Sequence, residues 1–198
     1  MLTDDPALFK DWLKATTLGW LLGFFLVVML AVAWDQLGGS AQFMVGIGMG
    51  AGVGSLQGRV LRRLEVDAYR WVAVTTLGMG LPFLLWDLSA AKGLDVFFSL
   101  PSCVVVGSAL AGALQSPLLR PRSGRTSLWI PASVIGWGLP AGGIALADAG
   151  ALSGGGALVS LGAMFLGGPV LGAVTGQALV RLPVQDSDPS GLARTTRP

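Results

Sequence analysis

Long apolar runs alternate with short polar segments along almost the whole chain. Each run has about the 20 residues that an α-helix, rising about 1.5 Å per residue, needs to cross a hydrocarbon layer of roughly 30 Å. Charged residues, glycine and proline collect between the runs. The pattern predicts six transmembrane helices, at about 15–34, 42–61, 69–88, 96–118, 127–147 and 156–180.

The basic residues gather on one side of these predicted spans. Every Lys and Arg except Lys92 lies before the first span, after the sixth, or in or next to the segments that join the second span to the third and the fourth to the fifth. The positive-inside rule therefore predicts that both termini are cytoplasmic. Ala31-Val32-Ala33 resembles a signal-peptide cleavage site. We expect a retained first helix, because the apolar run is long and its flank is acidic as well as basic.

Similar residues recur at intervals of 58 to 60 positions. One set of recurring residues lies in the first, third and fifth spans, and a second set lies in the second, fourth and sixth. Together they predict three copies of a two-helix hairpin, at about 10–64, 69–122 and 127–182. Copies with two spans each cross the membrane in the same sense, so we expect a pseudo-threefold axis along the membrane normal. The matching positions are Trp12, Thr16, Gly19 with Trp71, Thr75, Gly78 and Trp129, Ser133, Gly136, and Gly54, Gln57 with Gly112, Gln115 and Gly172, Thr175.

Small residues stand four apart in the second helix of every copy. Helices in lipid associate through close backbone approach, which such stripes permit. A homodimer face is the alternative, but three equivalent stripes in one chain favour packing inside the molecule. The predicted packing positions are Gly50, Gly54 and Gly58; Ser108, Gly112 and Ser116; and Gly168, Gly172 and Gly176.

The predicted fold class is an all-α integral membrane protein in which six transmembrane helices form three pseudo-threefold-related hairpins. Residues 1–182 are expected to form a single transmembrane domain. Residues 183–198 are rich in Pro, Ser, Asp, Arg and Thr, which predicts a disordered cytoplasmic tail.

Composition excludes several kinds of chemistry. Of the 198 residues 53% are hydrophobic and 12% charged, which is far from an ordinary soluble domain. The chain has no histidine, so imidazole ligation of metals and Ser-His hydrolysis are excluded. Its one cysteine, Cys103, lies in an apolar run and is expected to be a small buried hydrophobe. Enzyme motifs and a basic nucleic-acid patch are also missing, so we predict no catalytic residue, metal or cofactor.

A candidate site is a set of polar residues at equivalent positions in the cytoplasmic half. One hypothesis makes them a ring around the central axis that selects a small neutral solute or water. The other, which we favour, is that their hydroxyl and amide groups bond across the helices of each hairpin. The residues are Gln57, Gln115, Thr175, Thr16, Thr75 and Ser133.

The tryptophans fall into two groups. Trp20 and Trp137 lie deep in their spans, where they either flank an apolar ligand (a lipid tail, carotenoid or quinone) or, as we favour, pack against the glycine stripes. The others are expected to anchor the two membrane interfaces: Trp12, Trp71 and Trp129 on the cytoplasmic side, Trp34 and Trp86 on the outer side.

Helices of the form Trp-x-x-x-(Thr/Ser)-x-x-Gly-Trp that alternate with Gly-x-Leu-Gln-x-x-(Val/Leu)-Leu-Arg helices resemble those of a group of uncharacterised bacterial multipass membrane proteins. The resemblance extends to about Leu182. It implies a protein of the bacterial inner membrane built from hairpin repeats, and it supplies no activity.

Two functions remain open. The first is a non-enzymatic accessory or scaffold subunit that packs against a membrane-protein partner or a second copy of itself in the lipid bilayer. The second is a passive channel, transporter or binding protein for a small neutral or lipophilic molecule along the pseudo-threefold axis. Nucleic acid is not expected as a partner.

Overall fold

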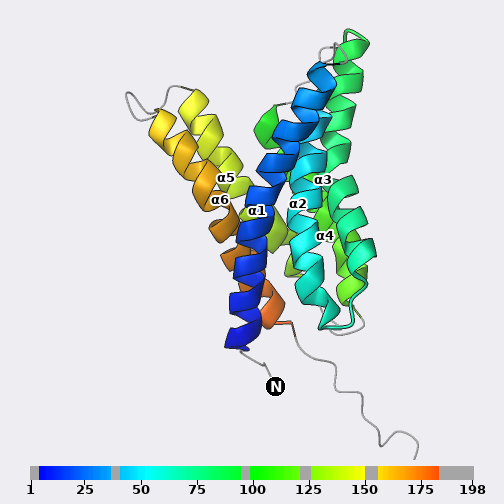
Figure 1. The fold of residues 1–198 in the computed structure, drawn as a ribbon, viewed down its shortest axis with the longest axis vertical. Helices are drawn as coiled ribbons and strands as arrows, with labels where there is room; N and C mark the ends of the chain where they lie inside the picture. Colours follow the sequence, from blue (N-terminus) through cyan, green and yellow to red (C-terminus); the bar gives the residue numbers. More distant parts are fainter. Residues whose placement is uncertain (1–4, 37–40, 95–98, 121–125, 150–155, 183–198) are drawn as a thin grey trace, which may run out of the picture.

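The computed structural model describes residues 5–36, 41–94, 99–120, 126–149 and 156–182 (Figure 1). Regular secondary structure in these segments is entirely α-helical, as predicted. The helices are α1 (Pro6–Asp35), α2 (Phe43–Arg62), α3 (Ala68–Ala91), α4 (Leu100–Leu119), α5 (Trp129–Asp148) and α6 (Gly156–Val180). The predicted tail at 183–198 lies outside the described residues.

Capping residues extend the helices beyond the apolar runs. The Asp5 carboxylate accepts hydrogen bonds from the backbone N–H groups of Ala7 and Leu8, so α1 begins well before the apolar run at about residue 15. Asp87 of α3 does the same for α2, accepting from the N–H groups of Gln42 and Phe43 at 2.9 and 2.8 Å. This contact explains how α2 starts without a capping side chain of its own.

Five of the six helices are long and apolar enough to cross a membrane, and α2 is not among them. Its glycines at positions 46, 48, 50, 52, 54 and 58 lower its hydropathy. The helix also exposes none of its large apolar side chains, whereas each of the other five helices exposes several. A helix enclosed in this way by its neighbours does not need an apolar surface of its own.

The six helices form a closed ring. Each helix packs against its neighbours in the chain, and α1 also packs against α6. We call the end where α1 begins and α6 ends the terminal face, and the other end the opposite face. At the opposite face α5 and α6 lean away from the remaining helices (Figure 1).

Two clusters of buried residues fill the ring. One contains Trp12, Trp71 and Trp129 and lies toward the terminal face; the other contains Trp20 and Trp137. Trp12, Trp71 and Trp129 are 0–1% exposed, so the expectation that they anchor an interface is wrong. Their indole groups lie in the core because they have buried hydrogen-bond acceptors there.

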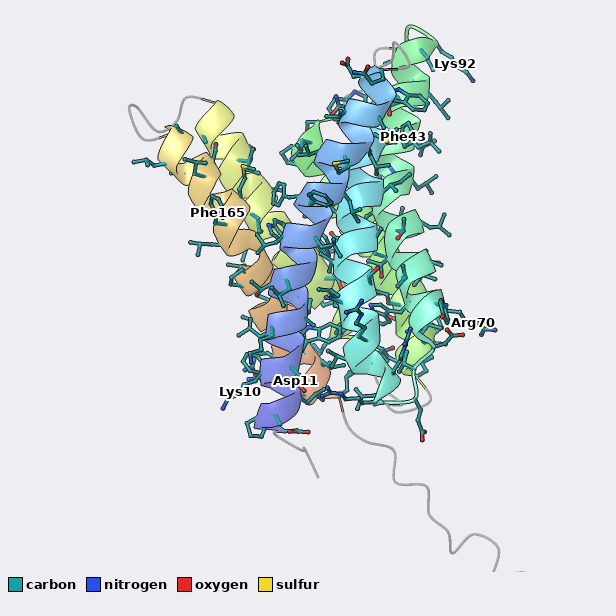
Figure 2. All side chains as sticks on the ribbon, viewed as in Figure 1. Lys10, Asp11, Phe43, Arg70, Lys92 and Phe165 are labelled. Carbon is teal, nitrogen blue, oxygen red and sulfur yellow. The ribbon has the colours of Figure 1, made fainter. Side chains whose placement is uncertain are left out.

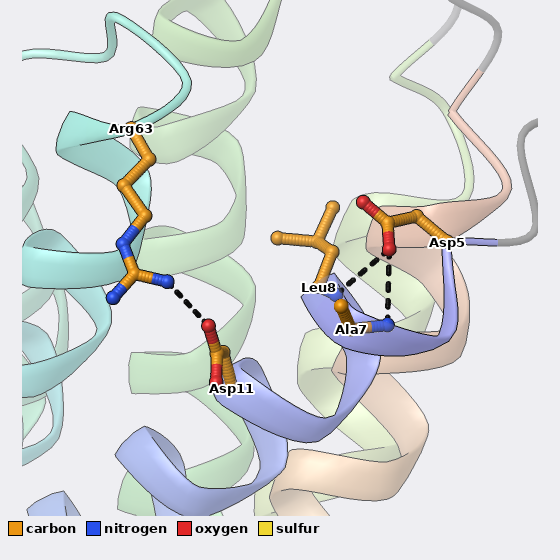
Figure 3. Close-up of polar contacts among 5 residues, drawn as sticks. All are labelled: Asp5, Ala7, Leu8, Asp11 and Arg63. Atoms are coloured by element: carbon orange, nitrogen blue, oxygen red, sulfur yellow. Dashed lines mark hydrogen bonds and ion pairs between the residues drawn. The ribbon is translucent and has the colours of Figure 1, made fainter.

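Charged side chains lie near the two ends of the bundle, as Lys10, Asp11 and Arg70 near one end and Lys92 near the other illustrate (Figure 2). An ion pair between Asp11 of α1 and Arg63, directly after α2, joins two elements at the terminal face (Figure 3). The side chains of Arg63 and Asp11 are 72% and 43% exposed, so solvent screens the pair and it adds little stability. Cys103 is free and completely buried, as predicted.

Candidate functional site

Three tryptophans meet in the middle of the ring. The ring centroids of Trp12, Trp71 and Trp129 are 5.6–6.2 Å apart, and all three pairs are edge-to-face, the arrangement that aromatic quadrupoles favour. The three side chains come from α1, α3 and α5. They close the centre of the bundle near the terminal face with apolar surface.

The Gln57 side chain joins three helices. Its amide N–H donates to the Thr16 hydroxyl of α1 at 3.2 Å, and its carbonyl accepts from the Trp71 indole N–H of α3 at 3.3 Å. An amide has both a donor and an acceptor, so a single glutamine on α2 satisfies both neighbours. Gln57 is only 4% exposed.

Gln115 makes the same two bonds one interval further along the chain. Its amide N–H donates to the Thr75 hydroxyl of α3 at 2.7 Å, and its carbonyl accepts from the Trp129 indole N–H of α5 at 2.8 Å. The Thr75 hydroxyl in turn donates to the carbonyl of Trp71. The pattern Thr–Gln–Trp thus recurs across α3, α4 and α5.

Thr175 occupies the corresponding place on α6. Its hydroxyl accepts from the Trp12 indole N–H at 2.9 Å and donates to the Leu171 carbonyl of its own helix at 2.6 Å. The first bond links α6 to α1, the last helix of the chain to the first. Ser133 is also buried. All six predicted polar residues are therefore interior, and no more than 4% of any of them is exposed.

The small residues of the even-numbered helices face the hydroxyl residue of the next odd-numbered helix. A Cβ built on Gly54 would lie 3.1 Å from the Cβ of Thr75, and the corresponding distances are 3.2 Å for Gly112 to Ser133 and 3.2 Å for Gly172 to Thr16. Contacts this short are tighter than nine in ten real Cβ contacts, so a larger residue would require the neighbour to move by a few tenths of an ångström. Four of the remaining predicted packing positions are glycines, and a Cβ built on any of them would have a neighbouring atom at 2.8–3.2 Å: Gly50, Gly58, Gly168 and Gly176. The other two are Ser108 and Ser116, whose hydroxyls donate to carbonyls of their own helix.

Glycines of the odd-numbered helices face the second helix of their own hairpin. A Cβ on Gly19 would lie 2.8 Å from the Val53 Cα, and one on Gly78 would lie 2.5 Å from the Ala111 Cα. A Cβ on Gly136 would lie 2.8 Å from a methyl group of Leu171. Each interface of the ring thus contains a glycine that no larger residue can replace without movement of its neighbour.

Trp20 and Trp137 pack against each other with ring centroids 5.4 Å apart and ring planes tilted by 38°. The Trp20 indole N–H donates to the Met164 carbonyl of α6, and its ring lies where a Cβ on Gly167 or Gly168 would be. The expected packing against a glycine stripe is therefore confirmed for Trp20. Trp137 instead packs on Trp20 and borders a cavity.

This cavity has a volume of about 100 Å³ and lies in the second core cluster. Every residue that lines it is apolar or glycine, and the lining comes from α1, α2, α3, α4 and α5. Its wall includes Trp20, Met79, Phe83, Val104, Trp137 and Ala141. Within the described segments, no group of three or more His, Cys, Asp or Glu is arranged to hold a metal ion.

Comparisons with known proteins give no match: none was found to a family model, a curated protein or a solved structure.

Sequence reasoning missed two features of this region. Trp12, Trp71 and Trp129 are partners of the polar residues, and the signal was their own recurrence in step with Gln57 and Gln115. The second is the cavity itself: the alternative that Trp20 and Trp137 flank an apolar ligand named two of its lining residues, but the space depends on how side chains from five helices pack, which no local pattern encodes.

Proposed function

We propose that the protein is a non-enzymatic polytopic protein of a bacterial inner membrane, with both termini in the cytoplasm, and that it acts as an accessory or scaffold subunit. One observation carries this proposal: the buried polar groups of the ring join helix to helix, while large apolar side chains cover the outside. Such an exterior suits contact with lipid or with another membrane protein.

We also propose that the ring consists of three copies of one hairpin around an axis along the membrane normal. Two independent sets of contacts support this. The Gln–Trp bond recurs from α2 to α3 and from α4 to α5. The close glycine–hydroxyl contact recurs from α2 to α3, from α4 to α5 and from α6 to α1.

Our proposal includes α2 among the helices that cross the membrane. Support comes from its place between α1 and α3, which are both apolar enough to cross a membrane. Helix α2 packs along these two helices through its glycines. A Cβ on Gly52 would lie 2.4 Å from the Cα of Gly23, so the two backbones are in contact. Little of α2 would meet the hydrocarbon of the bilayer.

A water-filled path along the axis is the weaker hypothesis. Five of the candidate polar residues already have partners among themselves and the tryptophans: Thr16, Gln57, Thr75, Gln115 and Thr175. The three indoles occupy the centre near the terminal face. A solute that passed along the axis would have to break the hydrogen bonds of the polar residues and displace the three indoles. The scaffold role is therefore favoured over a channel.

A second candidate function, binding of a lipophilic molecule, is favoured by the apolar cavity between Trp20 and Phe83. Pockets for small molecules are usually lined by hydrophobic and aromatic side chains, as this one is. The two functions are compatible, since a scaffold subunit can also hold a lipid.

The scaffold proposal is tested by photocross-linking in native membranes. Benzoylphenylalanine replaces Phe25 or Phe165, which are 60% and 65% exposed, or as a matched control Phe83, which is completely buried. Figure 2 shows that Phe165 points away from the bundle. We expect a stoichiometric companion to be cross-linked from an outward position and not from position 83. Recovery of the lone polypeptide after gentle purification, without cross-links, would contradict the scaffold role.

A further inference from the structure

The cavity of about 100 Å³ offers nothing to which water can bond. Its lining side chains are apolar, and the indole N–H of Trp20 already donates to the Met164 carbonyl at 2.7 Å. Buried waters need two to four polar partners, so apolar cavities stay dry. The space is therefore either empty or filled by hydrocarbon.

Unequal side chains at equivalent positions create this space. Position 141 on α5 corresponds to positions 24 and 83 on α1 and α3 by the repeat interval. Phe24 and Phe83 both line the cavity, but the third position holds Ala141. One wall thus lacks the ring that the other two supply.

The volume restricts what can enter. It is smaller than the engineered cavity of about 150 Å³ that accommodates benzene. A substituted quinone ring or the end ring of a carotenoid is bulkier than benzene and exceeds this volume. The end of one flexible alkyl chain, with a few methylene groups, fits a volume of this size, which is bordered on α5 by side chains from Trp137 to Ile144.

The cavity is only partly enclosed. Helices α1 and α5 both line it, although α6 stands between them in the ring and contributes no lining residue. The lining residues Phe24 and Ile144 are partly exposed, which makes an entrance on this side of the bundle accessible from outside. At this end of the molecule α5 and α6 lean away from α1 (Figure 1). In a bilayer, the molecules outside this entrance are phospholipids.

We propose that the cavity binds the methyl end of an acyl chain from a bilayer phospholipid. The inference rests on the proposed membrane location. A filled cavity restores dispersion contacts to Met79, Phe83 and Trp137 that an empty one lacks. The lipid then acts as part of the core between α1 and α5.

The test uses the full chain in vesicles of phosphatidylcholine with a photoreactive diazirine near the methyl end of one acyl chain. After irradiation, labelled residues are mapped by mass spectrometry. We expect labels on the lining residues Met79 and Phe83, and also on outward residues such as Leu77, which is 66% exposed.

Variants that fill the cavity should lose the labels on the lining residues and keep those on the outward residues. Val104→Phe and Ala141→Phe each place a ring in the space, so we expect loss of labelling at Met79 and Phe83. Val105→Phe is the matched control, because Val105 is 41% exposed and does not line the cavity. Two filling variants are used so that misfolding of one does not decide the result.

The other outcomes overturn the proposal in distinguishable ways. Labels on outward residues alone, or cavity labels that persist in both filling variants, leave the membrane location intact but exclude the acyl-chain site. If a free fatty acid carrying the same diazirine labels the cavity and the phospholipid does not, the occupant is not a phospholipid. Absence of all labelling and failure to float with vesicles would overturn the membrane location itself.

Discussion

At the scale of single residues, the amide side chains of Gln57 and Gln115 are the most informative feature. Each is buried and bonds to a hydroxyl on the preceding helix and an indole on the following one. A leucine of similar size would leave the indole N–H of Trp71 or Trp129 without its acceptor, and it would remove the bond to the Thr16 or Thr75 hydroxyl. A buried polar group without a partner costs free energy whether water or hydrocarbon surrounds the protein.

We predict that Gln57→Leu and Gln115→Leu each lower the free energy of unfolding by about 1 kcal/mol, within the range of interhelical hydrogen bonds in membrane proteins. For a chain of this size the melting temperature should fall by roughly 2–4 °C. Thermal unfolding in detergent measures the change. Gln177→Leu is the control, because Gln177 is exposed and should leave the melting temperature unaltered. Equal melting temperatures for all three variants would contradict a structural role for the network.

A second prediction concerns the indole N–H groups. Trp129→Phe keeps an aromatic ring in the core but leaves the Gln115 carbonyl without its donor at 2.8 Å. We expect a loss of about 1–3 kcal/mol from the unpaired acceptor and the smaller ring. Trp34→Phe changes a residue that is 37% exposed and should cost much less. If chemical denaturation in mixed micelles ranks the two variants in the opposite order, the tryptophans are not part of the core network.

The residue type alone did not distinguish tryptophans of the core from tryptophans at a membrane interface. Tryptophan near the start of an apolar helix is typical of an interface anchor, and Trp34 retains that exposure. Trp12, Trp71 and Trp129 differ only in what stands opposite them, which depends on the neighbouring helix. Their recurrence in step with the glutamines was visible in the sequence, but it did not reveal that the two sets bond.

At the scale of elements, helices were the predictable part of the fold. The apolar runs predicted six helices, and α6 begins and ends where expected. The start of α1 at Pro6 was missed because the cap at Asp5 extends the helix through a polar segment. Hydropathy also fails for α2, because a helix enclosed by α1 and α3 through glycine contacts need not be strongly apolar.

Those glycine contacts give a prediction for the α1–α2 interface. A Cβ at position 52 would lie 2.3 Å from the backbone nitrogen of Gly23, so Gly52→Ala must push the two helices apart. Overpacking of this kind costs about 1–3 kcal/mol. Gly142→Ala is the matched control, since its Cβ would meet nothing within 4 Å and alanine favours a helix by up to about 1 kcal/mol.

The two alanine variants should therefore shift stability in opposite directions. Two quantities are measured: the fraction of folded protein after extraction in mild detergent, and the free energy of unfolding of the extracted protein. A destabilised Gly142→Ala, or a Gly52→Ala as stable as the parent, would mean that the helices do not approach each other as closely as the structure has them.

At the scale of the whole molecule, the ring joins local features into one assembly. Among the described residues, hydrogen bonds cross the interfaces between α1 and α2, α2 and α3, α3 and α4, α4 and α5, and α6 and α1. The indole layer separates the terminal face from the apolar cavity. A rigid interior with an apolar exterior suits a protein whose role is to hold neighbours in place, which is the function we propose.

The central claim is that the chain crosses the membrane with every helix, α2 included. Accessibility of single cysteines in a Cys103→Ser background, probed in intact bacterial cells with a membrane-impermeant maleimide, tests it most directly. We place the cysteines at four exposed positions: Gln36, Tyr69, Lys92 and Arg120. The account predicts labelling at 36 and 92 in intact cells, and at 69 and 120 only after permeabilisation. Labelling of 36 and 69 from the same side would show that α2 does not cross, and would contradict the ring of membrane-spanning hairpins.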